Sequence, residues 1–436
     1  MRLIGHIGPM RLMRLIGPMR LIGPMRLMRL MRLMRLMRLM RPVRPMSLIG
    51  LIGLMSCLGL MGCSSDDDEL TERSSYHTMA GVQGYVAGFT EAKKTNETYE
   101  PVTRGWLPPT DPISGKPYEF FENRNLPISV FFAREKKGGE SPSEYAENMQ
   151  EEFFFKSGDK WRVSKDIESD TYYLYGYIPH DKSIESSVRK LEGEGKTYKD
   201  GAVLTLENIP TATSSDLCVV IGAKNGYGNG YTESGDYGIT GLHRGAFEYV
   251  ATGSDNNYVY LLFDHLYAAM CFRMTVQSDY AALRTIKVKD LSLQAYQGNT
   301  PTTKKMNAVI TLNATAGADP ISSIVFTPHG TEEAPCSFFS SESGYELGTN
   351  WSTFQAQFMP DRVTKLMLIS TYDVYDKKGN LIRKDCQATN TLNINLFDRQ
   401  TETIRGTRYT INLTLNPTYL YVLSEPDLDN PTVTVE

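Results

Sequence analysis

The sequence has little of what most enzymes and nucleic-acid-binding proteins need. It contains no Gly-x-Ser-x-Gly elbow and no His-Glu-x-x-His motif, so two common hydrolase motifs are missing. None of its 6 cysteines belongs to a Cys-x-x-Cys pair or has a histidine at zinc-like spacing. The formal net charge is -4, and many arginines crowd into the first residues, so the rest is more acidic still. This charge balance argues against a nucleic-acid partner.

Long amphipathic helices are also missing, and after Cys63 no apolar run is long enough to cross a bilayer. Short runs of Val, Ile, Tyr, Phe and Thr recur instead, separated by Gly, Pro, Asn, Asp and Ser. This pattern predicts an all-β chain of β-sandwiches. The predicted strands are Val82 to Phe89, Ile128 to Ala133, Thr171 to Tyr177, Ala202 to Leu206, Leu217 to Ile221, Tyr258 to Phe263, Ala269 to Val276, Thr285 to Tyr296, Asn307 to Leu312, Thr353 to Phe358, Lys365 to Tyr372, Thr391 to Leu396, Arg408 to Leu415 and Tyr419 to Leu423. Short helices are predicted for Ser143 to Glu152 and Ser186 to Glu192.

The chain divides by composition. Residues 1–39 repeat Met-Arg-Leu and Leu-Ile-Gly-Pro units without a core pattern. We interpret them as a low-complexity extension that is either untranslated or disordered, because a start at Met40 gives a signal peptide of ordinary length; a basic amphipathic membrane helix is the alternative. We then expect a signal peptide over 40–62, an acidic tether over 63–78, and two sandwich domains over 79–279 and 280–436.

Cys63 stands where a signal-like segment ends. Arg41 and Arg44 lead into an uncharged apolar run that closes with Leu60-Met61-Gly62-Cys63. The run resembles a bacterial lipobox, which implies lipidation of Cys63 and an anchor worth about 0.8 kcal/mol per buried methylene. Cys57 is a second candidate, but cleavage there would leave an exposed apolar tail. An ordinary secretory signal with a chance cysteine is the alternative.

Four acids follow the cysteine: Asp66, Asp67, Asp68 and Glu69. The cluster resembles the surface-export signal of lipoproteins from a group of Gram-negative anaerobes, which implies a place on the outer face of the cell outer membrane. It lacks the glycine and the spacing of a calcium loop.

Two segments read as loops. Residues 97–116 contain four prolines and include Arg104, and Asn225 to Gly253 is rich in glycine and tyrosine. In the second, Tyr227, Tyr231 and Tyr237 offer an exposed aromatic platform as one interpretation. The cysteines Cys218, Cys271, Cys336 and Cys386 fit either disulfides, such as 218 with 271 and 336 with 386, or buried free thiols.

Several runs, in order, resemble the fimbrillin family of surface lipoproteins that build or decorate fimbriae. The clearest is Leu261-Leu262-Phe263-Asp264-His265-Leu266-Tyr267-Ala268-Ala269-Met270-Cys271-Phe272, similar to a family strand of the form Phe-x-His-x-apolar-small. Ile128 to Ala133, Trp161 with Tyr172 to Pro179, and the closing Arg405-Gly406-Thr407-Arg408-Tyr409 are the others. The resemblance implies two transthyretin-like sandwiches. Arg273, inside the apolar strand, departs from the pattern.

His265 fits a structural role, donating to a backbone carbonyl at a bend between strands, and Asp264 fits a solvated position. A catalytic or metal-binding His265 would need further groups converging on it. We therefore expect no enzyme activity, no catalytic or metal residues and no cofactor.

The resemblance implies a structural or adhesive subunit of a cell-surface fimbria that partners other fimbrial subunits, with a host or glycan ligand as a further partner. It also implies a maturing cut after Arg104 that frees the first strand; Arg73 precedes that strand. The terminal segment, with Tyr419, Tyr421, Leu423, Val433 and Val435 at strand-like positions, fits either a donor strand or a strand that completes its own sandwich. The rival functions are a monomeric carbohydrate-binding lipoprotein and a glycan-active enzyme.

Overall fold

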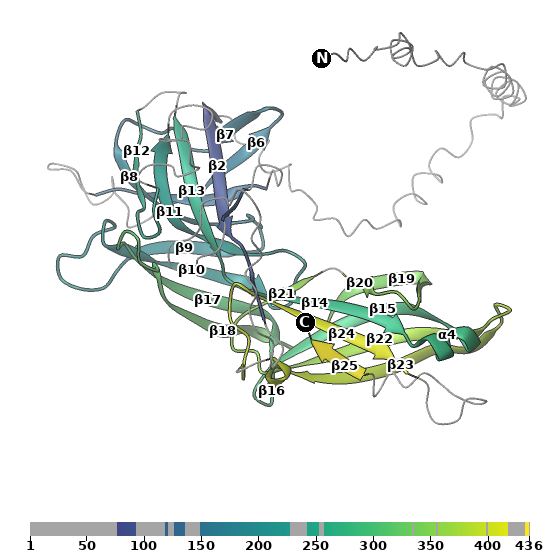
Figure 1. Ribbon diagram of the computed structural model, residues 1–436. Helices are drawn as coiled ribbons and strands as arrows, with labels where there is room; N and C mark the ends of the chain where they lie inside the picture. The colour runs from purple at the N-terminus through teal and green to yellow at the C-terminus, as the bar shows by residue number, and fades with distance from the viewer. Residues whose placement is uncertain are drawn as a thin grey trace, which may run out of the picture. The chain divides into compact units, whose positions relative to one another are not determined.

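The computed structural model is built almost entirely from β-strands (Figure 1), which confirms the predicted all-β class. It describes residues 76–92, 118–120, 126–135, 149–226, 242–252, 257–333, 335–354, 356–397, 400–416 and 432–435. Within these ranges, no helix has the length and apolar character needed to span a bilayer.

The elements follow one another in this order: β1 (His77–Met79), β2 (Gly81–Ala87), β3 (Thr90–Glu91), β4 (Tyr118–Phe120), β5 (Ile128–Ala133), β6 (Glu152–Ser157), β7 (Lys160–Val163), β8 (Thr171–Ile178), β9 (Glu185–Lys190), β10 (Gly201–Pro210), β11 (Cys218–Gly226), β12 (Glu248–Val250), β13 (Tyr258–His265), β14 (Ala268–Val276), α4 (Ser278–Leu283), β15 (Arg284–Gln297), β16 (Thr300–Pro301), β17 (Thr303–Asn313), β18 (Ile321–Glu333), β19 (Cys336–Leu347), β20 (Ser352–Thr353), β21 (Gln357–Met359), β22 (Lys365–Asp376), β23 (Leu381–Asn393), the 3-10 helix η2 (Ile394–Leu396), β24 (Thr407–Leu415) and β25 (Thr432–Val435).

A first apolar core lies between two sheets. One sheet has the order β1-β7-β6-β5-β8-β11-β13-β2-β4, with β12 also paired to β8, and the other has the order β18-β17-β10-β9. Strand β17 packs one of its faces against this core. Every second residue from Met306 to Leu312 is buried, while the residues between them are partly exposed. Strand β5 is buried at every position, as expected of a strand covered on both faces.

A second apolar core lies between two further sheets. The first has the order β20-β14-β24-β25, with β21 also paired to β14 and β3 to β24, and the second has the order β16-β15-β22-β23, with β19 paired to β15. Its buried residues include Phe272, Leu291, Leu368 and Leu413. Strand β22 alternates buried and partly exposed residues over most of its length.

The two cores do not follow the order of the sequence. Strands β17 and β18 come after α4, yet they contribute Met306, Ile310 and Ile324 to the first core. The amino-terminal segment serves both cores, because β2 pairs in parallel with β13 while β3 pairs with β24. The predicted domain limits at residues 279 and 280, which fall within α4, stay a prediction.

The predicted helix over Ser186 to Glu192 is wrong, because β9 covers Ser186 to Lys190 of it and pairs with β10. The pairing overrides local propensity, and Val188 packs against the first core. Of the predicted helix over Ser143 to Glu152, residues 143–148 lie outside the described ranges, and Glu152 begins β6. The predicted strand over Thr391 to Leu396 ends at Asn393, where η2 takes over.

Candidate functional site

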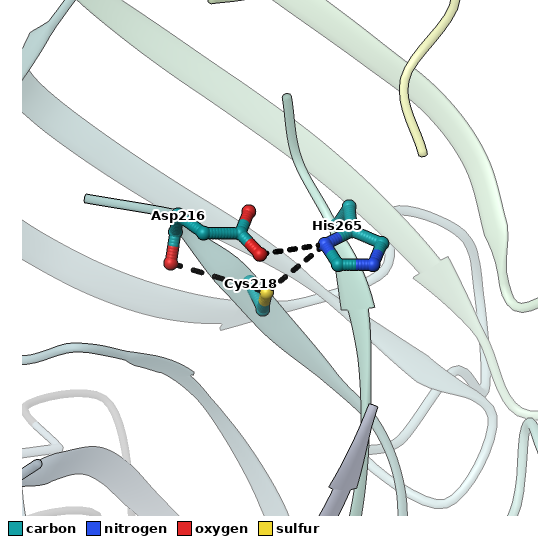
Figure 2. A group of neighbouring side chains, drawn as sticks. All are labelled: Asp216, Cys218 and His265. Atoms are coloured by element: carbon teal, nitrogen blue, oxygen red, sulfur yellow. Dashed lines mark hydrogen bonds and ion pairs between the residues drawn. The ribbon is translucent and has the colours of Figure 1, made fainter. Parts of the chain in front are cut away.

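Three side chains of metal-binding type meet at one end of the first core. Cys218 begins β11 and lies directly opposite His265, the last residue of the antiparallel strand β13. Asp216 precedes β11 by two residues, and Figure 2 shows its carboxylate and the Cys218 thiol pointing at the same edge of the imidazole ring. The Nδ1 atom of His265 lies 2.8 Å from Oδ2 of Asp216 and 3.5 Å from Sγ of Cys218.

The other face of this cluster is closed by the amino-terminal segment. The Nε2 atom of His265 is hydrogen-bonded to the carbonyl oxygen of Ala87, the last residue of β2. Phe89 stacks on the imidazole with a ring separation of 3.7 Å. The His265 and Asp216 side chains are 3% and 6% exposed, so the cluster is shielded from water.

These contacts define the proton positions on the ring. A carbonyl oxygen accepts only, so Nε2 must carry the proton that it donates to Ala87. In a neutral imidazole Nδ1 is then unprotonated, and it would face the Asp216 carboxylate without a hydrogen between them. The contact of 2.8 Å between Nδ1 and Oδ2 of Asp216 therefore calls for a hydrogen or a cation between the two atoms.

The arrangement is not a catalytic triad. In such a triad the nucleophile and the orienting carboxylate occupy opposite nitrogens of the histidine. Here the thiol and the carboxylate of Asp216 share Nδ1, and the thiol is fully buried. The structural role predicted for His265 agrees with its bond to Ala87, but the convergence of Asp216 and Cys218 on the ring was not anticipated.

Asp264, the neighbour of His265, is the centre of a buried ion-pair network. Its Oδ2 lies 2.8 Å from Nη1 of Arg405 and 3.2 Å from Nη2 of Arg244, and both arginines also reach Asp319. Burial alone would raise the pKa of Asp264, but Arg405 and Arg244 outweigh it and hold that pKa below its ordinary value. The expectation that Asp264 is solvated is therefore wrong.

The turn before β24 places Arg405 in this network. Gly406 has a φ of 65°, which favours glycine, and its N–H donates to the carbonyl of Tyr267. The hydroxyl of Tyr409 accepts the N–H of Ile404 at 3.0 Å. Burial raises the pKa of Tyr409 to about 12, so this hydroxyl stays protonated at neutral pH.

A separate hollow of about 310 Å³ lies beside β18. Phe326 and Ile324 line it together with Asp361, Arg362 and Glu402. Burial raises the pKa of Asp361, and the Oδ1 atom of this carboxylate has no hydrogen-bond partner. A mixed aromatic and acidic lining of this size suits a small polar ligand.

Most sequence-predicted site residues lie outside the described ranges: Cys63, Asp66, Asp67, Asp68, Glu69, Arg104, Tyr419, Tyr421, Leu423 and the tyrosines Tyr227, Tyr231 and Tyr237. Val433 and Val435 lie on β25, which pairs with β24 of the same chain opposite Leu413 and Ile411. Cys218 is buried and Cys271, Cys336 and Cys386 are partly buried, and these four described cysteines are not joined in disulfides. Arg273 of β14 lies over the ring of Trp351 at 5.7 Å, so its charge sits outside the core.

Comparison with known proteins gives structural likeness only, since no family model and no curated protein matches the sequence. A candidate cell adhesion protein from Bacteroides uniformis is 9% identical, with a TM-score of 0.33 over 81% of this chain and 96% of that one. A second, from Bacteroides fragilis, is 11% identical with the same TM-score and coverage. The tip fimbrial protein Mfa3 from Porphyromonas gingivalis, with a C-terminal truncation, is 10% identical over 81% of this chain and 100% of that one, with a TM-score of 0.22. Similarity at this level does not establish a shared function.

Proposed function

We propose that the chain is a structural or adhesive subunit of a cell-surface fimbria, exported as a lipid-anchored precursor and assembled by β-strand addition. The lipobox-like run at Cys63 and the acids after it support export and anchoring. The ordered runs that resemble the fimbrillin family support the fimbrial role. Among the described residues no triad geometry surrounds His265, which favours a non-enzymatic role.

The observation that carries strand addition is the placement of β2. This amino-terminal strand lies between β13 and the three-residue strand β4, and it buries Val82, Val86 and Ala87. Its loss would leave one edge of β13 unpaired, beside an apolar slot shaped for a replacement strand. Strand β25, the last described element, is the segment of this chain that would enter the slot of a neighbour.

Assembly is tested by the behaviour of the surface-extracted protein on unboiled gels. A subunit joined by strand addition forms a ladder that resists sodium dodecyl sulfate, since each junction is part of a β-sheet core. Electron microscopy of cells with and without the gene supplies the second readout. A protein that stays monomeric and leaves the cell surface unchanged on deletion contradicts the proposal.

A monomeric carbohydrate-binding lipoprotein is the second candidate, favoured by the hollow around Phe326 and Asp361. A hollow of this size, lined by an aromatic residue and several polar groups, is of the kind that holds a small polar ligand such as a sugar. Retention of the monomer on a glycan array, lost in Phe326→Ala and kept in the control Phe338→Ala, would support it. Failure of both wild type and control to bind any glycan would dismiss it.

A further inference from the structure

We propose that Asp216, Cys218 and His265 form a binding site for a divalent transition-metal ion, with Zn²⁺ as the best fit. The three side chains offer one oxygen, one sulfur and one nitrogen, and these atoms all lie within 4.8 Å of one another. Figure 2 shows them directed toward a common point at the edge of the imidazole ring. Nitrogen, sulfur and carboxylate oxygen are the ligands that zinc uses in proteins.

The separation of Nδ1 from Sγ fits a shared metal, and that of Nδ1 from Oδ2 fits one after a small adjustment. Tetrahedral zinc with bonds of about 2.0 to 2.3 Å places neighbouring ligand atoms roughly 3.3 to 3.7 Å apart. The separation of Nδ1 from Sγ is 3.5 Å and falls inside that range. The separation of Nδ1 from Oδ2 is 2.8 Å, so the Asp216 carboxylate must withdraw by about half an ångström. Asp216 precedes β11 and is not fixed by strand pairing, which permits this shift.

The surroundings of His265 match those of a metal-ligating histidine. Such a histidine almost always donates its second ring N–H to a carbonyl or carboxylate, which orients the ring and leaves the other nitrogen free to bind the ion. The Nε2 to Ala87 bond does this, and the stack of Phe89 at 3.7 Å holds the ring plane. Nδ1 is thereby directed at Asp216 and Cys218.

The buried Oδ1 atom of Asp216 favours a metal ion, rather than a proton, between His265 and Asp216. An imidazolium paired with Asp216 would use only Oδ2, whereas Oδ1 of this side chain is buried and has no hydrogen-bond partner. The cost of such an unpaired buried acceptor is about 1 to 3 kcal/mol. A bound ion satisfies Oδ1 by bidentate ligation or through a metal-bound water. It also supplies the positive charge that a buried Cys218 thiolate needs.

The probe is Co²⁺ alone, offered to the full-length chain in detergent, both folded and during refolding from denaturant. We expect one Co²⁺ per chain, a thiolate-to-cobalt charge-transfer band, and displacement of that band by Zn²⁺. Cys218→Ser, which keeps the side-chain size, should abolish the band and weaken Zn²⁺ binding by at least about tenfold. The control Cys271→Ser, a partly buried thiol on β14, should keep both.

Asp216→Asn supplies a second variant, and its Zn²⁺ affinity should also fall while the charge-transfer band persists. Circular dichroism checks that each variant folds. His265→Ala is not used, because it would also remove the contacts of the ring with Ala87 and Phe89. The absence of a band in folded and refolded wild type overturns the proposal. So does a band that survives in Cys218→Ser, which would place any cobalt elsewhere.

Discussion

Arg405 lies 141 residues after Asp264 in the chain, yet its Nη1 contacts Oδ2 of that aspartate at 2.8 Å. The contact joins the end of β13, in the first core, to the turn before β24, in the second. Arg244 completes the network from the segment just before β12, and its side chain is 3% exposed. One buried carboxylate therefore contacts two guanidinium groups, that of the buried Arg244 and that of the partly buried Arg405.

Asp264→Asn should destabilise the fold by about 3 to 5 kcal/mol, because the buried Arg244 would lose its buried counter-charge and keep the contact with the more exposed Asp319. Denaturant unfolding followed by tryptophan fluorescence measures the change. The matched control is Asp319→Asn, since Asp319 contacts both arginines but is 40% exposed. It should cost less than about 1 kcal/mol. Equal losses in the two variants would contradict the central role of Asp264.

The stability that Asp264 contributes to the fold should also depend on pH. The pKa of Asp264 is lowered in the folded state, so its contribution to stability is complete above the ordinary aspartate pKa of about 3.9 and is lost as the pH falls toward the lowered value. The stability gap between wild type and Asp264→Asn should therefore be constant from neutral pH down to about pH 5 and narrow below pH 4.

Cys63→Ala should release the protein from membranes or leave it unprocessed, because the anchor requires a sulfur at that position. Incorporation of labelled palmitate measures the change, and Cys57→Ala is the matched control that should label normally. Undiminished label in Cys63→Ala would show that lipidation occurs elsewhere.

Replacing Asp66, Asp67, Asp68 and Glu69 together with alanine should keep the lipid but strand the protein on the inner side of the outer membrane. Protease accessibility on whole cells checks this, with palmitate labelling as the control for lipidation. Unchanged digestion of the variant would remove the export role from these acids.

Much of the fold follows from the sequence because many buried strands carry their own signal. Ile128 to Ala133 is apolar and rich in β-formers, and it forms β5 with the predicted limits. Strands β9, β18 and β19 were missed because they are polar and largely exposed, so only their pairing partners reveal them. No sequence pattern predicted that β17 and β18 would join the first core.

The candidate site was harder to predict because it depends on strand register. His265 lies 49 positions from Asp216, and only the pairing of β11 with β13 brings them together. Asp-x-Cys at residues 216–218 was only a weak signal, because Asp216 lies before β11 and outside the alternation that places side chains on one face of a strand. Ala87, whose carbonyl oxygen accepts the N–H of His265 Nε2, lies 178 positions away on the parallel strand β2.

Arg104→Ala should prevent maturation if cleavage after this arginine frees the first strand. The expected result is surface protein in which β2 stays covalently linked to the rest of the chain, because after cleavage β2 would be held only by non-covalent contacts such as its pairing with β13 and β4. Peptide mapping of surface-extracted protein measures it. Arg73→Ala is the control, since a cut there removes only the tether. Wild-type surface protein that yields an intact peptide across Arg104 would dismiss this cut.

Truncation after Pro417 removes the terminal segment with Tyr419, Tyr421, Leu423, Val433 and Val435. Under the proposal, the truncated and processed protein should fold but lose its detergent-resistant multimers, because no strand remains for the neighbour's slot. If the truncated chain unfolds instead, β25 completes its own sandwich and donates nothing.

The most direct test of assembly by strand addition is to lock β25 onto β24. Asn412 and Thr434 lie opposite each other in that antiparallel pair, at a separation that a disulfide spans. Asn412→Cys with Thr434→Cys, oxidised before processing, should remain monomeric on an unboiled gel and regain the ladder on reduction, whereas each single variant assembles throughout. A full ladder from the oxidised double variant would show that the strand never leaves its own sheet and would contradict the account.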